Sequence, residues 1–316
     1  MNIWESLKKP IFILAPMEDV TDTVFRRMII ECGRPDLFFT EFTNVEGLAS
    51  LGDRIVGQRL LFTPEEKPII AQIWGKNPQH YYEAAKKIHA MGFDGIDINM
   101  GCPEKSVVKN GCCAALINTP TLASEIIHAT QDGAEGLPVS VKTRIGYNTI
   151  ATESWISFLL THDLAAITVH GRTAKELSLV PTHWDEIQKA VELRNASGEK
   201  TLIIGNGDIE SYEEAKEKVR LYSVDGTMIG RGIFQDPYLF SAHSTWKQET
   251  IQNRLLLLQR HVELYTQVWG ENKHFPIMKK YVKIYVSGFD NASDIRLQLM
   301  EAKTSDEMIE KIHRLL

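Results

Sequence analysis

The sequence has few cysteines, and none of them forms a pattern that would build a disulfide framework or a zinc site. Its 316 residues include four: Cys32, Cys102, Cys112 and Cys113. They contain no C-x-x-C pair, and adjacent cysteines are poorly placed to bridge each other. No Cys or His lies at the spacing of zinc ligands. The composition argues against a small secreted scaffold, and we expect no metal site.

Long apolar runs and a strong positive charge are also missing. No apolar run reaches the ~18 residues that a membrane helix needs, and the opening MNIWESLKKP lacks the apolar core of a signal peptide. We therefore expect a cytoplasmic protein without a membrane partner. The net charge of −6 argues against non-specific nucleic-acid coating. Residues 247–316 nevertheless hold 11 basic and 9 acidic side chains, a bias compatible with a specific RNA partner.

Short apolar runs, by contrast, recur along the first three quarters of the chain and alternate with helix-like stretches such as residues 78–92. Most are apolar on successive residues, as strands buried on both faces should be. Eight such strands alternating with helices predict a (β/α)8 TIM barrel. An open doubly wound sheet is the alternative, but no glycine-rich dinucleotide fingerprint follows the first run. The runs are residues 11–17, 37–43, 68–75, 95–101, 138–146, 165–173, 201–209 and 226–234.

The pattern changes after about residue 245. Apolar residues at spacings of three and four, from Leu255 to Trp269, predict one amphipathic helix. We expect a second helix in FPIMKKYVKIYVSGF (275–289) and a third after Thr304, which with Glu307 forms a candidate capping box. The predicted organisation is a catalytic barrel, 1–245, followed by a small all-α domain, 246–316.

Polar residues gather where the predicted strands end, which in a barrel is the rim that carries active sites. GNGD (205–208) and GRG (230–232) lie after the seventh and eighth strands, the usual phosphate site of this fold, although tight turns alone could explain them. Lys142 and Arg144 lie on one face of their strand. The lysine could form a Schiff base, bind a phosphate, neutralise an anionic cofactor or simply pair structurally.

Cys102 stands between a glycine and a proline at the end of the fourth predicted strand. A nucleophilic thiolate would want a basic partner or a helix N-terminus, and no Cys-His pair can be read from the sequence. A thiol can instead donate a proton, because its ordinary pKa of ~8.5 keeps it mostly protonated at neutral pH. We interpret Cys112 and Cys113 as small packing residues.

Taken together, these segments resemble the tRNA-dihydrouridine synthase family of FMN-dependent oxidoreductases over nearly the whole chain. The most specific are DINMGCP (97–103), VSVKTRIG (139–146), VHGRT (169–173) and MIGRG (228–232). LAPMEDVTD (14–22), AQIWG (71–75), IGNGDI (204–209) and the tail MKKYVKIYVSGFDNASDIR (278–296) also match.

The resemblance implies an activity and its partners. NADPH, or NADH, would reduce FMN, which would pass a hydride to C6 of a uridine in tRNA, while Cys102 protonates C5. The tail would bind the tRNA, and the protein would act as a monomer. Reaching a base in folded RNA requires unstacking it, at a few kcal/mol, which contacts elsewhere on the RNA must offset.

The resemblance also assigns residues. Around the flavin it implies Pro16, Met17 and Glu18 beside the ring or ribityl chain, Gln72, Lys142 and His170 at the ring, and Asn206, Gly207, Asp208, Gly230 and Arg231 at the phosphate. For the substrate it implies Asn99 and Arg144 at the uracil edge, Arg172 nearby, and Lys279, Lys280 and Lys283 on the RNA backbone.

One loop departs from the family pattern, and rival functions share some motifs. After HGRT the family commonly has a Gln and then a Tyr, where this chain has Glu176 and Ser178, so its contacts with the substrate base could differ. The nearest rival is an FMN barrel that reduces a free pyrimidine, as dihydroorotate dehydrogenases do. Two more distant rivals are a Schiff-base aldolase that uses Lys142 and a non-catalytic RNA-binding barrel.

Overall fold

The computed structural model describes residues 2–50 and 52–316 and divides the chain into two compact units. The first comprises Met1–Thr23 and Pro35–Gly230, and the second Val24–Arg34 and Arg231–Leu316. The division therefore falls at Gly230 instead of the expected 245, and an early segment joins the late unit. The physical reason is packing: Phe25 stacks on Tyr281, with ring centroids 5.4 Å apart. Chain order alone does not reveal such a long-range contact.

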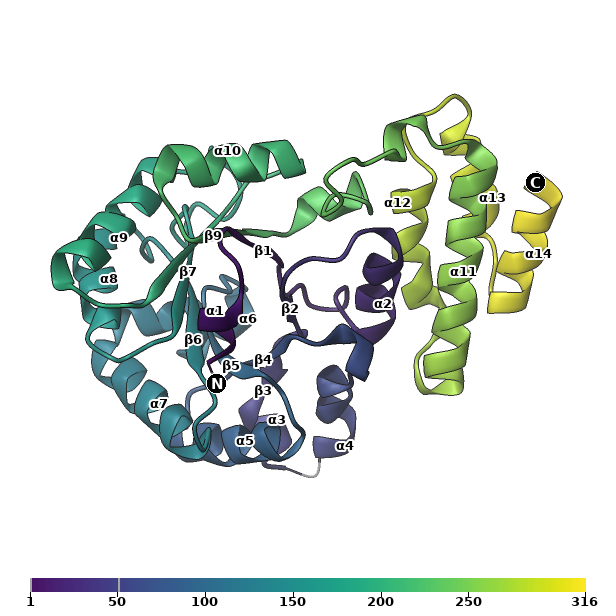
Figure 1. The fold of residues 1–316 in the computed structure, drawn as a ribbon. Helices are drawn as coiled ribbons and strands as arrows, with labels where there is room; N and C mark the ends of the chain where they lie inside the picture. Colours follow the sequence, from purple (N-terminus) through teal and green to yellow (C-terminus); the bar gives the residue numbers. More distant parts are fainter. Residues whose placement is uncertain (1, 51) are drawn as a thin grey trace. The chain divides into compact units, whose positions relative to one another are not determined.

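The first unit is a nearly closed parallel barrel, as predicted, with helices around its strands (Figure 1). Its strands follow the order β1-β9-β8-β7-β6-β5-β4-β2, and a bridge between Ile13 and Leu37 joins the two ends. Each predicted run contains a strand, and a further short strand begins at the last residue of the second run. The strands are β1 (Ile11–Leu14), β2 (Phe38–Phe39), β3 (Thr43–Asn44), β4 (Ile69–Trp74), β5 (Gly95–Met100), β6 (Val139–Arg144), β7 (Ala166–His170), β8 (Leu202–Asn206) and β9 (Gly226–Ile229).

The helices of this unit begin and end at recognisable signals. The side chain of Asn77 accepts a hydrogen bond from the backbone of Gln79 at the start of α5, and Gly92 with φ +80° follows its end, as the sequence predicts. The helices are α1 (Ile3–Ser6), α3 (Val45–Leu48), α4 (Asp53–Val56), α5 (Pro78–Ala90), α6 (Lys105–Lys109), α7 (Pro120–Gly133), α8 (Thr152–Leu160), α9 (Trp184–Ser197) and α10 (Tyr212–Tyr222).

The barrel interior has an apolar end and a polar end. Nearer the strand starts, at what we call the lower end, a fully apolar cluster fills the interior. It contains Trp4, Ile11, Ile13, Ala15, Leu37, Phe39, Ile70, Ala166, Leu202, Ile204 and Met228. Nearer the strand ends, at the upper end, the buried side chains are polar and include Gln72, Asp97 and Asn99. Apolar packing thus supports a rim of polar groups, which is the layout of a barrel enzyme.

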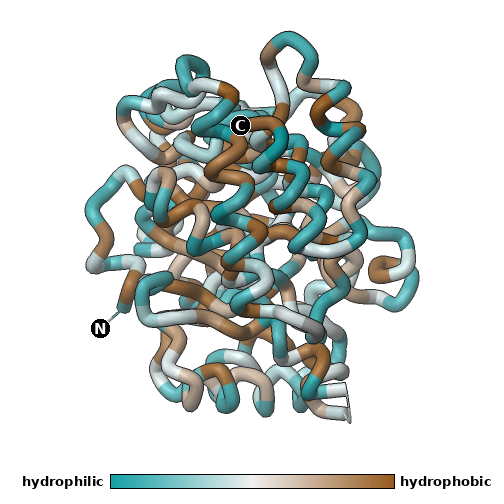
Figure 2. Tube along the Cα trace, turned by 90° about the vertical axis from the view of Figure 1, so that its right-hand side faces the viewer, coloured by the Kyte–Doolittle hydropathy of each residue, from teal (hydrophilic) through white to brown (hydrophobic). Residues whose placement is uncertain are grey.

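The second unit is helical. It contains α2 (Thr23–Cys32, from Val24 on), α11 (Ile251–Trp269), α12 (Val282–Tyr285), α13 (Ala292–Met300) and α14 (Ser305–Leu315). The predicted stripe of α11 is buried from Leu255 to Trp269. Hydrophobic and hydrophilic residues alternate along its helices (Figure 2). None of the described helices is both long enough and apolar enough to cross a membrane.

Two details of this unit differ from the expected three helices. Residues 275–289 form a 3-10 helix, Phe275–Tyr281, and then the short α12, which ends where Val286 leaves helical dihedrals. Helix α13 has no counterpart in the sequence-based prediction. The Thr304 side chain does cap α14 by accepting a hydrogen bond from the Glu307 backbone, 3.2 Å. The Glu307 carboxylate accepts a hydrogen bond from the Lys303 backbone, one residue before the predicted box.

Candidate active site

The loop that carries Cys102 is held from both sides by its neighbours. Asn99, at the end of β5, accepts hydrogen bonds through Oδ1 from the backbone N–H groups of Gly101 and Cys102, both 3.0 Å. Arg144, the last residue of β6, donates through Nε to the Gly101 carbonyl, 2.7 Å. Cys102 as a residue is partly exposed. The strand ends therefore fix the backbone of a cysteine that is not fully buried.

The acidity of this thiol differs from the sequence-based expectation. A hydrogen bond with the Cys113 thiol is the largest cause that lowers the pKa of Cys102, to about 7, and the nearby Arg144 guanidinium also favours the thiolate. Cys113 is buried, and burial raises its own pKa well above the ordinary value. Cys102 is therefore about half ionised at pH 7 instead of mostly protonated. Cys113 packs in the core as predicted and also tunes its neighbour, a role that the sequence did not reveal.

Beneath this loop lies a carboxylate to which the sequence alone assigns no role. Asp97 is fully buried, accepts a hydrogen bond from Ser140 Oγ at 2.6 Å, and accepts another from Gln72 Nε2 at 2.7 Å. Burial raises the pKa of Asp97 to about 6, and its two donors and Lys142 oppose that rise. Gln72 Oε1 in turn accepts from Asn99 Nδ2 at 3.0 Å. A continuous series of hydrogen bonds thus joins Asp97 to the backbone of Cys102.

Lys142 lies opposite this series on β6. Its Nζ donates to Asn206 Oδ1 at 3.1 Å, and Asn206 Nδ2 donates to the Met228 carbonyl at 2.7 Å. Burial, followed by the charge of Arg144, lowers the pKa of Lys142 to about 8. The lysine is therefore still largely cationic at pH 7, and a bound anion would raise its pKa and favour the cation further. Because both ends of the Asn206 amide are engaged inside the barrel, its side chain orients Lys142.

Arg144 and Arg172 anchor the loops that follow β6 and β7. Arg144 Nη1 donates to the carbonyls of Thr173 and Leu177, 2.9 and 3.0 Å, and burial lowers its pKa to about 10. Arg172 is 3% exposed, donates through Nε to Val180 at 2.6 Å, and pairs with the Asp208 carboxylate. Both guanidinium groups thus shape the rim, whatever part they also take in substrate binding.

The loops expected to hold a phosphate show mixed features. Gly207 has φ +135°, and a Cβ there would lie 2.6 Å from Thr182 Oγ1, so only glycine fits. A Cβ on Gly230 would meet only ordinary contacts, among them the Met17 sulfur at 3.8 Å. The Asp208 carboxylate accepts from Thr182 Oγ1, 2.9 Å, as well as pairing with Arg172. Any phosphate contact from Asp208 would therefore come from its backbone.

The other predicted residues fall into three places. Pro16 and Met17 follow β1, and the Glu18 carboxylate pairs with Arg59 at 2.5 Å. His170 ends β7, with Nε2 3.4 Å from Arg172 Nη1. The basic residues Arg231, Lys279 and Lys280 belong to the second unit, where Lys279 Nζ donates to the Met300 carbonyl at 2.7 Å. Their predicted contacts with phosphate remain predictions.

The chemistry of the rim fits an anionic flavin cofactor better than a metal. The Lys142 ammonium group supplies positive charge, and its strand neighbour Thr168 has a buried hydroxyl without a partner among the described residues. Gly207 and Gly230 carry no side chain of their own. Within 2–50 and 52–316, no group of three or more His, Cys, Asp or Glu could hold a metal ion. The residues present therefore fit an anionic, hydrogen-bonding cofactor.

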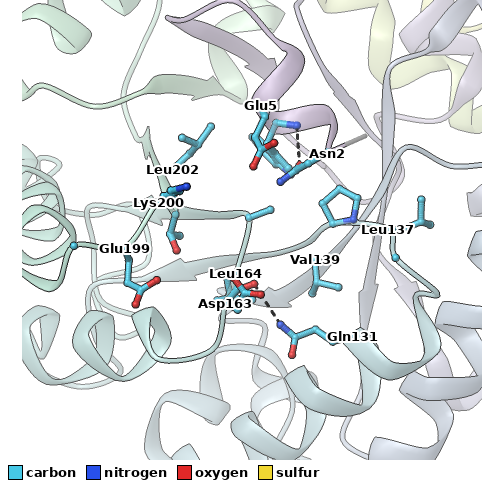
Figure 3. Close-up of a pocket in the computed structure, with 16 residues that line it drawn as sticks. Asn2, Glu5, Gln131, Leu137, Val139, Asp163, Leu164, Glu199, Lys200 and Leu202 are labelled. Carbon is cyan, nitrogen blue, oxygen red and sulfur yellow. Dashed lines mark hydrogen bonds between the residues drawn. The ribbon is translucent and has the colours of Figure 1, made fainter.

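A cavity of about 660 Å³ lies at the other end of the barrel (Figure 3). It is lined near the starts of β6, β7 and β8 by residues that include Val139, Leu202, Gln131 and Lys200. None of the predicted site residues lines it. Since barrel enzymes build their sites at the strand ends, we assign the chemistry to the rim around Cys102 and Lys142.

Comparisons with known proteins agree with this architecture. A family model described as "Dihydrouridine synthase (Dus)" matches residues 13–315. A "Probable tRNA-dihydrouridine synthase" of Staphylococcus aureus (strain MRSA252) is 43% identical over 97% of this chain and 93% of its own length. A "Probable tRNA-dihydrouridine synthase 2" of Bacillus subtilis (strain 168) is 42% identical over 97% and 94%. A solved morphinone reductase in complex with tetrahydroNAD shares the fold alone, with a TM-score of 0.52 and 14% identity over 74% of this chain and 86% of that one.

Proposed function

This chain belongs to the dihydrouridine synthase family, and we propose that it reduces the C5–C6 double bond of specific uridines in tRNA, with FMN as its flavin and NADPH as the reductant. The observation that carries the proposal is the partly exposed residue Cys102, whose thiol has a pKa of about 7, on the same rim as the Lys142 ammonium group. One group can donate a proton and the other can stabilise negative charge.

The reaction adds one hydride and one proton to the uracil ring. When bound, the reduced flavin supplies the hydride to C6. Cys102 then donates its thiol proton to C5, and the resulting thiolate regains a proton from solvent. The hydrogen bonds from the Gly101 and Cys102 backbone to Asn99 hold the thiol in position for this transfer. Lys142, held by Asn206, would stabilise the negative charge of the reduced flavin ring.

The hydrogen bonds restrict which atoms of Asn99 and Arg144 could contact the uracil edge. Asn99 uses its oxygen for the Cys102 loop and one amide N–H for Gln72, so a uracil contact would come from its remaining N–H. Arg144 uses Nε and Nη1 on loop carbonyls, which leaves Nη2 to face the base. Pro16, Met17, Gln72 and His170 would border the flavin.

Binding of tRNA would rest on the second unit. Lys280 and Lys283 are exposed there, and phosphate contacts from such lysines would offset the cost of unstacking the target base. We further propose that the protein acts as a cytoplasmic monomer.

The experiment that tests this function uses purified protein and tRNA from a strain that lacks the enzyme. Dihydrouridine formed with NADPH is measured by mass spectrometry, with NADH, free uridine and free orotate in parallel reactions. We expect reduction of tRNA, faster with NADPH, and none of the free pyrimidines. Reduction of a free pyrimidine but not of tRNA would contradict the proposal and favour the small-molecule rival.

A further inference from the structure

The hydrogen bonds between Asp97 and Cys102 have a direction that chemistry imposes. An ionised carboxylate has only acceptors, so Gln72 must present its amide nitrogen to Asp97, as observed at 2.7 Å. The Gln72 oxygen then faces Asn99 and accepts from its amide nitrogen at 3.0 Å. Asn99 is left with its oxygen toward the Gly101 and Cys102 N–H groups. Each step fixes the orientation of the next.

The position of Asp97 makes a purely structural explanation costly. The side chain is fully buried in the barrel interior, where a carboxylate loses hydration that two hydrogen bonds only partly replace. An uncharged residue of similar size would avoid that cost. The negative charge of Asp97 also raises the pKa of Lys142 and so helps the lysine to keep its proton.

We propose that Asp97 is a positioning residue whose acceptor-only carboxylate, acting through the Gln72 and Asn99 amides, sets the orientation of the Cys102 backbone for proton donation. The inference rests on the proposed function for its meaning in catalysis, but its geometric part does not depend on that function. Asp97 acts on the Cys102 backbone through two other side chains, Gln72 and Asn99.

The decisive variant is Asp97→Asn in the purified, flavin-containing protein. A neutral amide can donate as well as accept, so position 97 no longer forces the Gln72 and Asn99 amides into one orientation. In the molecules in which these amides turn over, the Cys102 loop loses its acceptor and the alignment of Cys102 with Cys113 is disturbed. We expect the midpoint of the pH–rate profile for Cys102 alkylation by iodoacetamide to rise by about one unit, toward the ordinary thiol value. The rate at which pre-reduced protein reduces uridine in tRNA should fall about tenfold, with less than a twofold change in KM.

A reciprocal exchange provides the rescue. In the double variant Asp97→Asn with Gln72→Glu, the new amide donates to the new carboxylate, which also accepts from Asn99. Asn99 then regains its original orientation with no change in net charge. The alkylation midpoint should return to within about 0.3 units of the parent, even if the altered position 72 weakens flavin binding. Alkylation is followed by mass spectrometry, because Cys32, Cys112 and Cys113 are buried and react slowly.

Ser140→Ala is the matched control. It removes one donor from Asp97 but leaves the carboxylate an acceptor, so the alkylation midpoint should stay near that of the parent. An unchanged midpoint in folded Asp97→Asn, or a double variant that remains shifted, would overturn the proposal. If Asp97→Asn alone does not fold, the double variant against the parent decides. Should the parent make no dihydrouridine, the proposed function fails, while the thiol measurements still judge the positioning role.

Discussion

The two ends of the barrel interior are built from the same strands, but burial stabilises the fold at one end and costs stability at the other. At the lower end Ile13, Ile204 and Met228 pack in an apolar cluster, whose burial stabilises the fold at about 25 cal/mol per Å². At the upper end Asp97 and Lys142 are withdrawn from water, which costs stability. A strand that contributes Ile204 to the first end contributes Asn206 to the second. The comparison teaches that the lower end holds the barrel together so that the upper end can carry groups that do not.

Removing the Cys102 thiol should give the largest effect, because this group of the upper end acts in the reaction and does not support the fold. In Cys102→Ala we expect dihydrouridine formation to fall by about 10²–10⁴-fold, the usual range for loss of a general acid, with unchanged flavin content and thermal midpoint. Single-turnover mass spectrometry, flavin absorbance and circular dichroism measure the three. Cys112→Ala, at a buried thiol bonded only weakly to the Asn110 carbonyl, should behave like the parent. Equal rates in the two variants would show that Cys102 is not the acid.

A truncation at the lower end should do the opposite. Ile204 is fully buried in the apolar cluster, so Ile204→Ala should lower the free energy of unfolding by about 2–5 kcal/mol. Urea titration measures the loss, and the rate per folded molecule should stay within about twofold of the parent. A variant with parental stability but impaired catalysis would break the distinction between the two ends.

The buried carboxylate offers a third test, now of stability against pH. The folded-state pKa of Asp97, about 6, lies above the ordinary value of 3.8, so the parent loses stability as the pH rises from about 4 through about 6. Asp97→Asn lacks this titration. The stability of this variant relative to that of the parent should therefore increase by up to ~3 kcal/mol between pH 4 and pH 7. A difference that does not vary with pH would place Asp97 in a more hydrated environment.

Much of the lower end could be predicted from the sequence. Runs of successive apolar residues located every strand of the barrel, because strands buried on both faces need apolar residues on both. Helix α11 followed from its spacing of three and four, and the cap at Thr304 from its side chain. What the sequence could not reveal was packing between distant segments, such as Phe25 against Tyr281, or the break of residues 275–289 into two short helices.

The upper end was predictable in its members but not in their connections. Polar residues at strand ends marked Gln72, Asn99, Cys102 and Lys142 as site candidates, and the structure joins the first three by hydrogen bonds. Asp97 was not predicted as a site residue, because an acidic residue inside an apolar run gives no sign of its partners. The role of Cys113 was not predicted either, because its contact with Cys102 depends on a backbone turn, with φ +53° at Cys113, that the sequence does not show.

The activity should report the acidity of Cys102 directly. A general acid must be protonated to act, so proton transfer in pre-reduced protein should decline about tenfold per unit as the pH rises beyond the Cys102 pKa of about 7. Cys113→Ala removes the hydrogen bond that lowers this pKa and should move the decline to higher pH. Single-turnover rates between pH 5.5 and 9 measure both. Identical profiles in parent and variant would show that Cys113 does not tune the acid.

The smallest expected effect concerns affinity and tests whether charge outside the barrel matters more than charge at its lower end. Lys283 is exposed in the second unit, and Lys200 is exposed beside the lower cavity. If the second unit grips the RNA backbone, Lys283→Ala should weaken tRNA binding by a few-fold and lower the slope of log K against log salt by about one. Lys200→Ala should change neither, although it removes the same charge from the same molecule. Filter binding at several salt concentrations gives the slopes. Equal slopes for the two variants would show that Lys283 makes no phosphate contact, because a long-range effect of net charge would be the same at both positions.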